Sequence, residues 1–483
     1  MRLPYPVLCT QLLLLAAVSG GCDRQASAPK QHRNAIHVAA QAPSDAAVLD
    51  VPDADSVGEA SRAEQRRACA FSAEAPAEDT LDPGAPTGDA IPIDHFVVIM
   101  QENRSFDHYF QALPDSGQPD VDVAPSDFSN PKAKGSNERV TIHHNEKYCQ
   151  NDLEHGWSSV HKQVASGSMQ GFVEASSGDP EVMAYYNGAD LPYYYSLANT
   201  FAIADHYFSD VLGPTFPNRS FLIMGSSHGL ASNGPVPEDA RQSSIFHRLA
   251  QADIDFKIYA DQRVLEEKIL PNLRADLGDH FASMDEYYNA AANGALPAFA
   301  FVESSLRGSF DGVDEHPPSN VQFGQQFVAS VLDALMQSPN WSKSAAFLTY
   351  DEHGGFYDHV APPRACLPDD QEPVLGKLAT PGRFDQFGIR VPFLVISPYA
   401  KPHYVSHRVF SHSALLRLLE ARFSLPAISA RTANAEPPLD MFDFEHPTFT
   451  TPPSLPEAGI DPVKLQRCRK SFPYKPSPAT QPD

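Results

Sequence analysis

Residues 95–107 read HFVVIMQENRSFD, where a short run of apolar and β-branched side chains passes directly into a polar segment. Runs of this length with little alternation are typical of strands buried on both faces of a parallel sheet. Glu102 and Asn103 then stand at the carboxyl end of the strand, which is the edge where open α/β sheets hold their ligands. The segment therefore predicts a buried strand whose end carries a site.

Four further runs resemble this strand, and patterns of helical periodicity lie between them. The runs cover residues 256–260, 298–302, 345–349 and 391–397, and the helical spacing is clearest in 321–336 and 414–423, with Ser411 placed to cap the second helix. Alternation of strand and helix predicts an α/β fold with a mostly parallel central sheet and helices on both faces, which is a three-layer α/β/α sandwich.

Composition divides the chain into four parts. Residues 1–22 combine Arg2, an apolar run and small residues before Cys22, which predicts an export signal, compatible with a lipoprotein whose lipidated Cys22 tethers it to a membrane. Residues 23–89 are poor in aromatic side chains and predict a disordered linker. Residues 90–445 form the expected catalytic domain, with a polar insertion at about 115–195 that we interpret as a lid or substrate wall. Residues 446–483 predict a proline-rich tail.

Charge and cysteine content narrow the class of protein. The 483 residues carry 36 basic and 60 acidic side chains, a net charge of −24, which disfavours a nucleic-acid partner. No protein partner is indicated. Beyond the signal region four cysteines remain, Cys69, Cys149, Cys366 and Cys468, and an even number predicts one or two disulfides in an exported protein without selecting among three pairings. We expect a periplasmic, envelope-anchored or secreted location.

A second pair of carboxylates follows another predicted strand. Residues 345–350 lead into Asp351 and Glu352, and parallel strands would bring this pair to the same edge as Glu102 and Asn103. Oxygen ligands of this kind favour Mg²⁺, Ca²⁺ or Mn²⁺, while Zn²⁺ or iron becomes compatible if a histidine joins. Alone, either pair has the simpler interpretation of a hydrated strand end. Together they predict a divalent metal site.

Thr215 lies in the segment LGPTFPNRSF, residues 212–221, where Pro217 suits the first turn of a helix. Thr215 would then stand just before a helix N-terminus, which favours a phosphate group. A threonine hydroxyl is a weak nucleophile, and a bound cation activates such groups by stabilising the anion. Capping of the helix is the structural alternative for Thr215.

Histidines supply the remaining candidates. His155 in DLEHGW and His316 in DEHPP are placed in polar segments where an imidazole can hold phosphoryl oxygens or protonate a leaving alcohol. His280 and His353 are weaker candidates for additional phosphate contacts. Any single histidine is more often structural than catalytic.

These segments together resemble the bacterial phospholipase C and acid phosphatase family of the alkaline-phosphatase-like superfamily. Five motifs carry the resemblance, in order: ENRSFDHYF from Glu102, GPT with Asn218 and Arg219, EHPP from Glu315, YDEHGGFYDHV from Tyr350, and VPF from Val391. The resemblance covers about residues 92–425.

The resemblance implies a role for each candidate residue. Glu102, Asn103, Asp351 and Glu352 are expected to bind the metal ion, and Thr215 to be the nucleophile. His155 and His316 are expected to bind phosphate or act in acid–base catalysis, and Asn218 and Arg219 belong to the catalytic motif around Thr215. His280 precedes a predicted strand in a way that is similar to the family.

The combined prediction is a metal-dependent phosphoric ester hydrolase that acts through a phosphothreonine, as an acid phosphatase or a phospholipase C. About 60 residues follow the matched region, which favours the shorter phosphatase-like branch. A sulfatase is disfavoured, because threonine at position 215 cannot supply the formylglycine aldehyde that those enzymes use. The alternative is an envelope-anchored binding protein with a catalytically degenerate site that holds a phosphorylated ligand.

Overall fold

The computed structural model describes residues 60–304 and 311–473, built around one eight-stranded sheet. The strand order is β13-β6-β12-β11-β1-β10-β8-β9. In that order the strands are Tyr404–Ser406, Ala202–Ala204, Phe393–Ile396, Ser344–Tyr350, His95–Gln101, Phe299–Glu303, Phe256–Tyr259 and Phe281–Ala282. The five strands that the sequence predicts all lie in this sheet.

Strand β1 occupies an interior position and pairs in parallel with β10 and β11, with Phe96 opposite Phe299 and Ala345. Every residue from Phe96 to Met100 is at most 1% exposed. Strand β12 runs antiparallel to β11 and β6, whereas the remaining pairs in the sheet are parallel. The sheet is therefore mixed and mostly parallel, as predicted.

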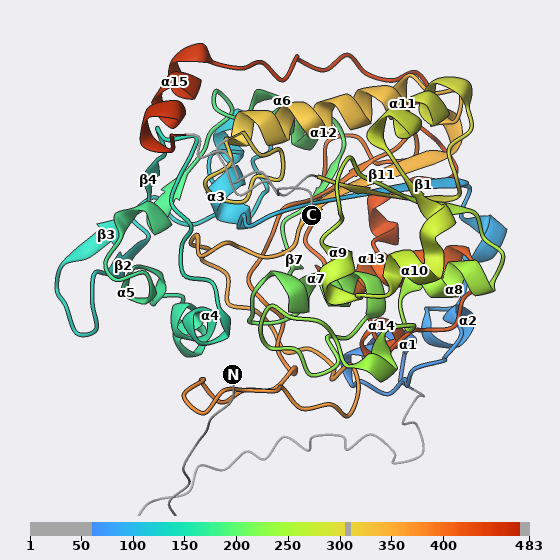
Figure 1. The fold of residues 1–483 in the computed structure, drawn as a ribbon, viewed down its shortest axis with the longest axis horizontal. Helices are drawn as coiled ribbons and strands as arrows, with labels where there is room; N and C mark the ends of the chain where they lie inside the picture. The colour runs from blue at the N-terminus through green and yellow to red at the C-terminus, as the bar shows by residue number, and fades with distance from the viewer. Residues whose placement is uncertain (1–59, 305–310, 474–483) are drawn as a thin grey trace, which may run out of the picture. The chain divides into compact units, whose positions relative to one another are not determined.

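Helices cover both faces of the sheet, which gives three layers (Figure 1). One face carries α6 (Pro192–Thr200), α11 (Met284–Asn293) and α12 (Val321–Met336). The other carries α7 (Thr215–Met224), α8 (Ile245–Gln251), α10 (Leu273–Leu277) and α13 (His412–Arg422). The α/β/α sandwich predicted from the sequence is confirmed.

The remaining helices are short, and three small sheets lie outside the central one. These helices are α1 (Arg62–Arg67), α2 (Ala77–Thr80), α3 (Phe106–Phe110), α4 (Trp157–Val164), α5 (Phe172–Ala175), α9 (Glu266–Ile269), α14 (Ala430–Ala433) and α15 (Pro462–Ser471). The small sheets pair β2 (Ser129–Pro131) with β3 (Arg139–Thr141), β4 (His143–His144) with β5 (Ala184–Tyr185), and β7 (Tyr207–Phe208) with β14 (Phe410–Ser411). Within the described residues, no helix has both the length and the apolarity that a bilayer crossing needs.

Both predicted helices form, and one cap differs from the expectation. Helix α12 has the predicted bounds, with Asn320 as its capping side chain. Ser411 occupies the N-cap position of α13, but its hydroxyl donates to Asp210 at 3.2 Å instead of accepting from the helix. The prediction that the Ser411 side chain caps this helix is therefore wrong, because the N–H of Ser413 donates to the buried carboxylate of Asp210 at 3.0 Å instead.

The predicted linker is wrong for residues 60–89, which pack on the folded body. Cys69 forms a disulfide with Cys366, and Ala77 and Leu81 are buried. Arg66 is 3% exposed and forms ion pairs with Asp82 and Glu436. A few apolar side chains, one ion-pair network and a covalent link therefore order a segment whose composition alone indicated disorder. The export signal, and the linker up to residue 59, lie outside the described residues.

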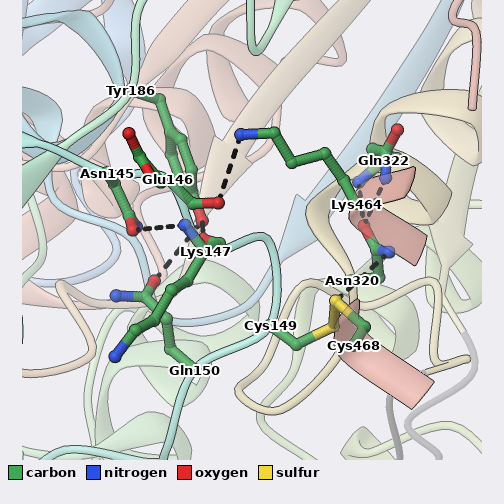
Figure 2. Close-up of a disulfide and its surroundings, with 10 residues drawn as sticks. All are labelled: Asn145, Glu146, Lys147, Cys149, Gln150, Tyr186, Asn320, Gln322, Lys464 and Cys468. Carbon is green, nitrogen blue, oxygen red and sulfur yellow. Dashed lines mark hydrogen bonds between the residues drawn. A yellow bond between two sulfur atoms is a disulfide. The ribbon is translucent and has the colours of Figure 1, made fainter. Parts of the chain in front are cut away.

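The predicted tail is also tied to the body. Helix α15 lies in it, and Cys468 of this helix forms a disulfide with Cys149 (Figure 2). Lys464 of the same helix donates to the backbone oxygen of Glu146 at 3.2 Å. The folded body thus extends beyond 90–445 at both ends, and the two disulfides resolve the pairing that the sequence left open.

The polar insertion at 115–195 builds a small core of its own. Val160 and Val164 of α4 pack with Phe172 of α5 and with Phe356, which follows β11. This second core fixes the insertion against the polar edge of the central sheet, and so positions the loop that carries His155.

Candidate active site

The ends of β1 and β11 bring the two predicted pairs of oxygen ligands side by side. Gln101 lies opposite Tyr350 in the parallel register, so the residues after both strands emerge together. The backbone N–H of Asn103 donates to Asp351 Oδ1 at 2.9 Å, and the N–H of Asp351 donates to the oxygen of Gln101 at 3.0 Å. The geometric part of the prediction is confirmed, while the binding of a metal ion stays a prediction.

Each of these four side chains has one buried oxygen without a hydrogen-bond partner among the described residues. The oxygens are Oε2 of Glu102, Oδ1 of Asn103, Oδ2 of Asp351 and Oε1 of Glu352. An unpaired buried polar atom costs about 1–3 kcal/mol, and more if it is charged. Four such atoms at one strand edge form the donor set that a hard divalent cation takes. The residues therefore fit a metal ion.

The charges of this cluster favour a cation as well. Burial raises the pKa of Asp351 well above its ordinary range, and the nearby carboxylates of Glu102 and Glu352 raise it further. Burial also opposes ionisation of Glu352, but His155 and His353 outweigh burial and lower the pKa of Glu352. Carboxylates held this close in a buried site need a compensating positive charge.

Arg219 supplies part of that charge from beneath the site. Its side chain is fully buried, and its Nε donates to Glu102 Oε1 at 2.7 Å. Its Nη1 donates to Glu266 at 2.8 Å and to Glu303 at 2.9 Å. We predicted Arg219 as catalytic, but the structure leaves it no exposed face that could contact substrate. It is a positioning residue that holds Glu102.

Asn218 is likewise a positioning residue, not a catalytic one as predicted. Its Oδ1 accepts from the backbone N–H groups of Asp210 and Val211 at 2.9 and 3.0 Å. Its Nδ2 donates to the oxygens of Gly213 and Pro214 at 2.9 and 3.1 Å. With both ends of the amide used inside the protein, Asn218 fixes the loop that leads to Thr215.

Thr215 is the first residue of α7 and is 4% exposed. The N-cap position belongs to Pro214, so Thr215 lies one residue further into the helix than we predicted. We find no hydrogen bond from its hydroxyl to another described residue. Thr215 and Arg219 are four residues apart and so share a helix face. Because Arg219 contacts Glu102, this face of α7 is directed toward the carboxylate cluster.

His155 lies against the carboxylate cluster on another side. Its Nε2 is 3.8 Å from Glu352 Oε1 and 3.4 Å from Asn103 Nδ2, and its side chain is 12% exposed. Burial tends to lower the pKa of His155, but the charges of Glu352 and Asp152 outweigh burial and raise it. The imidazole is thus placed to contact a ligand above Asn103 and Glu352.

His316 joins His155 in the same place. The two rings are 6.2 Å apart between centroids, and the oxygen of Asp314 accepts from the N–H of Glu102 at 2.9 Å. That hydrogen bond brings the loop around residue 316 to the end of β1. The two histidines that the sequence singled out, although 161 positions apart, therefore face one another.

His353 and His280 have other roles than the predicted phosphate contact. His353 is 1% exposed, with Nδ1 3.2 Å from Glu352 and Nε2 2.8 Å from Gln163, so it orients Glu352. His280 stacks on Phe256 with ring centroids 3.9 Å apart. Phe256 pairs with Phe299, at the amino ends of the strands, so His280 lies at the opposite edge of the sheet. Both predictions are wrong in this respect.

Sequence analysis missed the carboxylates that balance Arg219. Glu303 ends β10 in the way that Glu102 follows β1, and this position after an apolar run was a usable signal. Glu266 lies in the short helix α9, and nothing in its local sequence marked it. His412 also supports the site, since its Nε2 donates to the backbone oxygen of Asp351 at 2.8 Å and so fixes the end of β11.

Comparison with known proteins places this geometry in a family. The model of the "Phosphoesterase family" matches residues 93–426. Non-specific phospholipase C6 of Arabidopsis thaliana is 34% identical over 64% of this chain and 62% of its own length. Phospholipase C B of Mycobacterium tuberculosis is 28% identical over 84% of this chain and 90% of its own length. A non-hemolytic phospholipase C of Burkholderia pseudomallei is 30% identical over 82% of this chain and 65% of its own length.

The chain thus spans less than two thirds of the plant and Burkholderia proteins and most of the mycobacterial one. Among solved structures, an alkaline phosphatase superfamily protein of Vibrio parahaemolyticus matches 68% of this chain and 78% of its own, with a TM-score of 0.34 and 12% identity. A lipoteichoic acid synthase of Listeria monocytogenes matches 72% of this chain and 78% of its own, with a TM-score of 0.34 and 10% identity.

Proposed function

Since the chain belongs to the phosphoesterase family, we propose that it is a metal-dependent phospholipase C, which cleaves a phospholipid between diacylglycerol and the phosphorylated headgroup. The relatives named phospholipase C support this reaction class and substrate over the phosphomonoesters of an acid phosphatase. The two disulfides support a location outside the cytoplasm. We also propose that the protein is exported and that a lipid attached to Cys22 anchors it to the cell envelope.

The observation that carries the proposal is the set of four unpaired buried oxygens at the ends of β1 and β11. Glu102, Asn103, Asp351 and Glu352 would hold the metal ion. A divalent cation bound there would neutralise buried carboxylates, act as a Lewis acid toward a phosphoryl oxygen and favour the ionised form of a hydroxyl.

The protein's own groups would divide the remaining work. Thr215 lies at the start of α7, where free N–H groups favour a phosphate, and its hydroxyl is the proposed nucleophile. Attack by Thr215 Oγ1 on phosphorus breaks the bond to the diacylglycerol oxygen, which takes up a proton. His155 and His316 lie next to each other, with ring centroids 6.2 Å apart, and are placed to bind phosphoryl oxygens or supply that proton. Water then attacks phosphorus and breaks its bond to Thr215 Oγ1, which restores the threonine hydroxyl and releases the phosphorylated headgroup.

The nucleophile is tested by Thr215→Ala and Thr215→Ser. We expect the alanine variant to lose turnover of a soluble phosphocholine ester by roughly 10³-fold or more, because nucleophilic catalysis is removed. The serine variant keeps a hydroxyl and should retain part of the activity, and acid quenching should trap phosphocholine on residue 215. An alanine variant with wild-type turnover would exclude Thr215 as the nucleophile.

The substrate class is tested by product analysis. Phosphatidylcholine should yield diacylglycerol and phosphocholine, whereas a simple phosphomonoester should release little inorganic phosphate. The reverse result would identify an acid phosphatase. Tight phosphate binding without turnover, across added divalent ions, would instead support the degenerate binding protein.

A further inference from the structure

Two exposed aliphatic side chains share one loop near the proposed active site. Val374 is 77% exposed and Leu378 is 99% exposed. In the described part of the chain, the other large hydrophobic residues with such exposure are Val409 at 43% and Val463 at 59%, on separate segments. Single exposed aliphatic residues are ordinary, but a pair on one loop indicates a surface that meets an apolar partner.

The loop is held in place by its inward side. Leu375 and Ala379 pack on a cluster that includes Trp157. The indole N–H of Trp157 donates to the oxygen of Thr380 at 2.9 Å, and the N–H of Val374 donates to the oxygen of Gly229 at 2.8 Å. Leu375 and Ala379 thus hold the loop from its inner side, while Val374 and residues 376–378 are exposed to solvent.

The cluster beneath the loop also borders the proposed catalytic residues. Trp157 follows His155 by two positions and begins α4. Val211 belongs to the same cluster and lies in the loop that Asn218 holds before Thr215. A Cβ atom at Gly213 would lie 3.6 Å from the Trp157 ring. The loop that exposes Val374 and Leu378 is therefore anchored to both segments that carry His155 and Thr215.

The loop segment 373–383 differs in charge from the rest of the chain. Residues 373–383 contain Lys377 and Arg383 and no carboxylate, whereas the whole chain has 60 acidic against 36 basic side chains. Arg383 pairs with Glu372 at the base of the loop at 3.0 Å. Lys377 stands between the two exposed aliphatic residues. Between Val374 and Leu378 a phosphate-bearing surface would thus meet the cation Lys377, while the carboxylates of Asp370, Glu372 and Asp385 belong to the flanking segments.

We propose that residues 373–383 dock the protein on a phospholipid bilayer, with Val374 and Leu378 inserted at the level of the acyl chains and Lys377 among the phosphates. The inference rests on the proposed function, because a phospholipid substrate lies in a bilayer. Aliphatic side chains flanked by a cation are the residue types that anchor proteins in the membrane interface. Docking through this loop would bring the bilayer close to the segments that carry His155 and Thr215.

The proposal is tested with vesicles made of equal parts phosphatidylcholine and phosphatidylglycerol. In the Thr215→Ala background, which prevents hydrolysis, Val374→Ser/Leu378→Ser should weaken vesicle binding by roughly 100-fold, about tenfold for each side chain. The matched control Val409→Ser/Val463→Ser removes the other two exposed aliphatic residues and should bind as its parent does. Equal binding by the loop variant and its parent, or an equal loss in the control, would overturn the proposal.

A second measurement does not depend on loss of binding. Leu378→Trp should show a blue-shifted emission on vesicles and be quenched by lipids brominated on their acyl chains, whereas Val463→Trp should not. Emission unchanged by vesicles would overturn the docking surface.

Turnover separates this inference from the proposed function. With Thr215 intact, Val374→Ser/Leu378→Ser should hydrolyse a soluble phosphocholine ester at the wild-type rate and vesicle lipid more slowly. Wild-type rates on vesicles would overturn the docking surface alone. Docking through the loop without hydrolysis of any phospholipid would overturn the proposed function alone.

Discussion

Two groups of buried carboxylates follow β1 and β11, and they differ in how their charge is neutralised. The ligand cluster, defined as Glu102, Asn103, Asp351 and Glu352, leaves four buried oxygens unpaired. The clamped cluster lies slightly further along both segments and consists of Asp107, Asp358, His359 and Arg390. There Arg390 donates to Asp107 and to Asp358 at 2.9 Å each, and His359 Nδ1 lies 2.7 Å from Asp107.

Asp107, Asp358 and His359 also place ligand atoms within 4.8 Å of one another, and we infer from the comparison that such a concentration does not by itself define a metal site. Asp107 and Asp358 are as deeply buried as Asp351, but a permanent guanidinium charge completes their cluster. In the ligand cluster Arg219 is shared among Glu102, Glu266 and Glu303, and Asp351 and Glu352 lack an arginine partner within the described residues. Incomplete neutralisation is thus what distinguishes the proposed site.

The largest expected effect is on activity. Asp351→Asn should lower turnover of a soluble phosphocholine ester by roughly 10³-fold or more, because it removes a proposed metal ligand. Asp358→Asn should change turnover per folded molecule by less than about tenfold, since Asp358 serves Arg390. Steady-state kinetics, with folding checked by circular dichroism, make the comparison. Similar losses in both variants would remove the distinction between the clusters.

The free energy of unfolding, unlike turnover, should depend on the clamped cluster. Arg390→Met would leave Asp107 and Asp358 buried without their counter-charge, and we expect the free energy of unfolding to fall by about 3–5 kcal/mol. Turnover of the molecules that remain folded should persist. Arg219→Met is the informative contrast, because it should reduce both stability and activity. Urea unfolding at constant pH measures the change, and an Arg390→Met variant as stable as the wild type would contradict it.

A divalent metal ion should stabilise the folded protein by binding to the ligand cluster and not to the clamped cluster. At 100 times its dissociation constant, a cation that binds the native state adds about 2.7 kcal/mol of stability. After dialysis against chelator, titration with Mg²⁺, Ca²⁺, Mn²⁺, Zn²⁺ or Fe²⁺ should raise the unfolding midpoint of the wild type and of Asp358→Asn. Asp351→Asn should not respond. A response that Asp358→Asn loses and Asp351→Asn keeps would place the ion in the clamped cluster.

The smallest effect concerns pH. Burial tends to lower the pKa of His359, but Asp107 outweighs burial and raises that pKa to about 9, with Arg390 opposing and Asp358 assisting. Asp122 also contacts this imidazole, with its Oδ1 3.1 Å from Nε2. Because the pKa in the folded state lies above the unfolded value of about 6.5, protonated His359 stabilises the fold.

That contribution is complete below about pH 6.5 and is lost as the pH rises through 9. We expect a loss of about 2–3 kcal/mol between pH 7 and 10. His359→Gln should flatten this part of the stability curve. Urea unfolding at several pH values measures both proteins, and parallel curves would show that His359 does not titrate in this range.

Local sequence was sufficient for the interior of the fold and for the pairs at the strand ends. The apolar runs around Phe96 and Phe347 are typical of buried strands, and their parallel pairing brings Glu102 and Asp351 to one edge. Sequence could not show that Asn218 and Arg219 face inward. The partners of Asn218 depend on the conformation of the loop before Thr215, and Glu266, a partner of Arg219, is 47 residues away. It also could not place His280, whose distance from the site depends on which end of β8 it reaches.

The ordered chain ends were missed for a related reason. Residues 60–89 and helix α15 have compositions that do not support a core of their own. Arg66 and Cys468 order them through partners that lie hundreds of residues away, at Glu436 and Cys149. Interactions over such separations leave no local pattern.

The two disulfides have a consequence for proteolysis. Cys69–Cys366 and Cys149–Cys468 close loops of 297 and 319 residues that overlap. Any single cut between residues 69 and 468 therefore leaves the two fragments covalently joined. A molecule nicked once in this range should run at its full mass on a non-reducing gel and separate only after reduction. A protease that cuts between residues 69 and 468 would therefore need a second cut in this range before it could release a fragment of it.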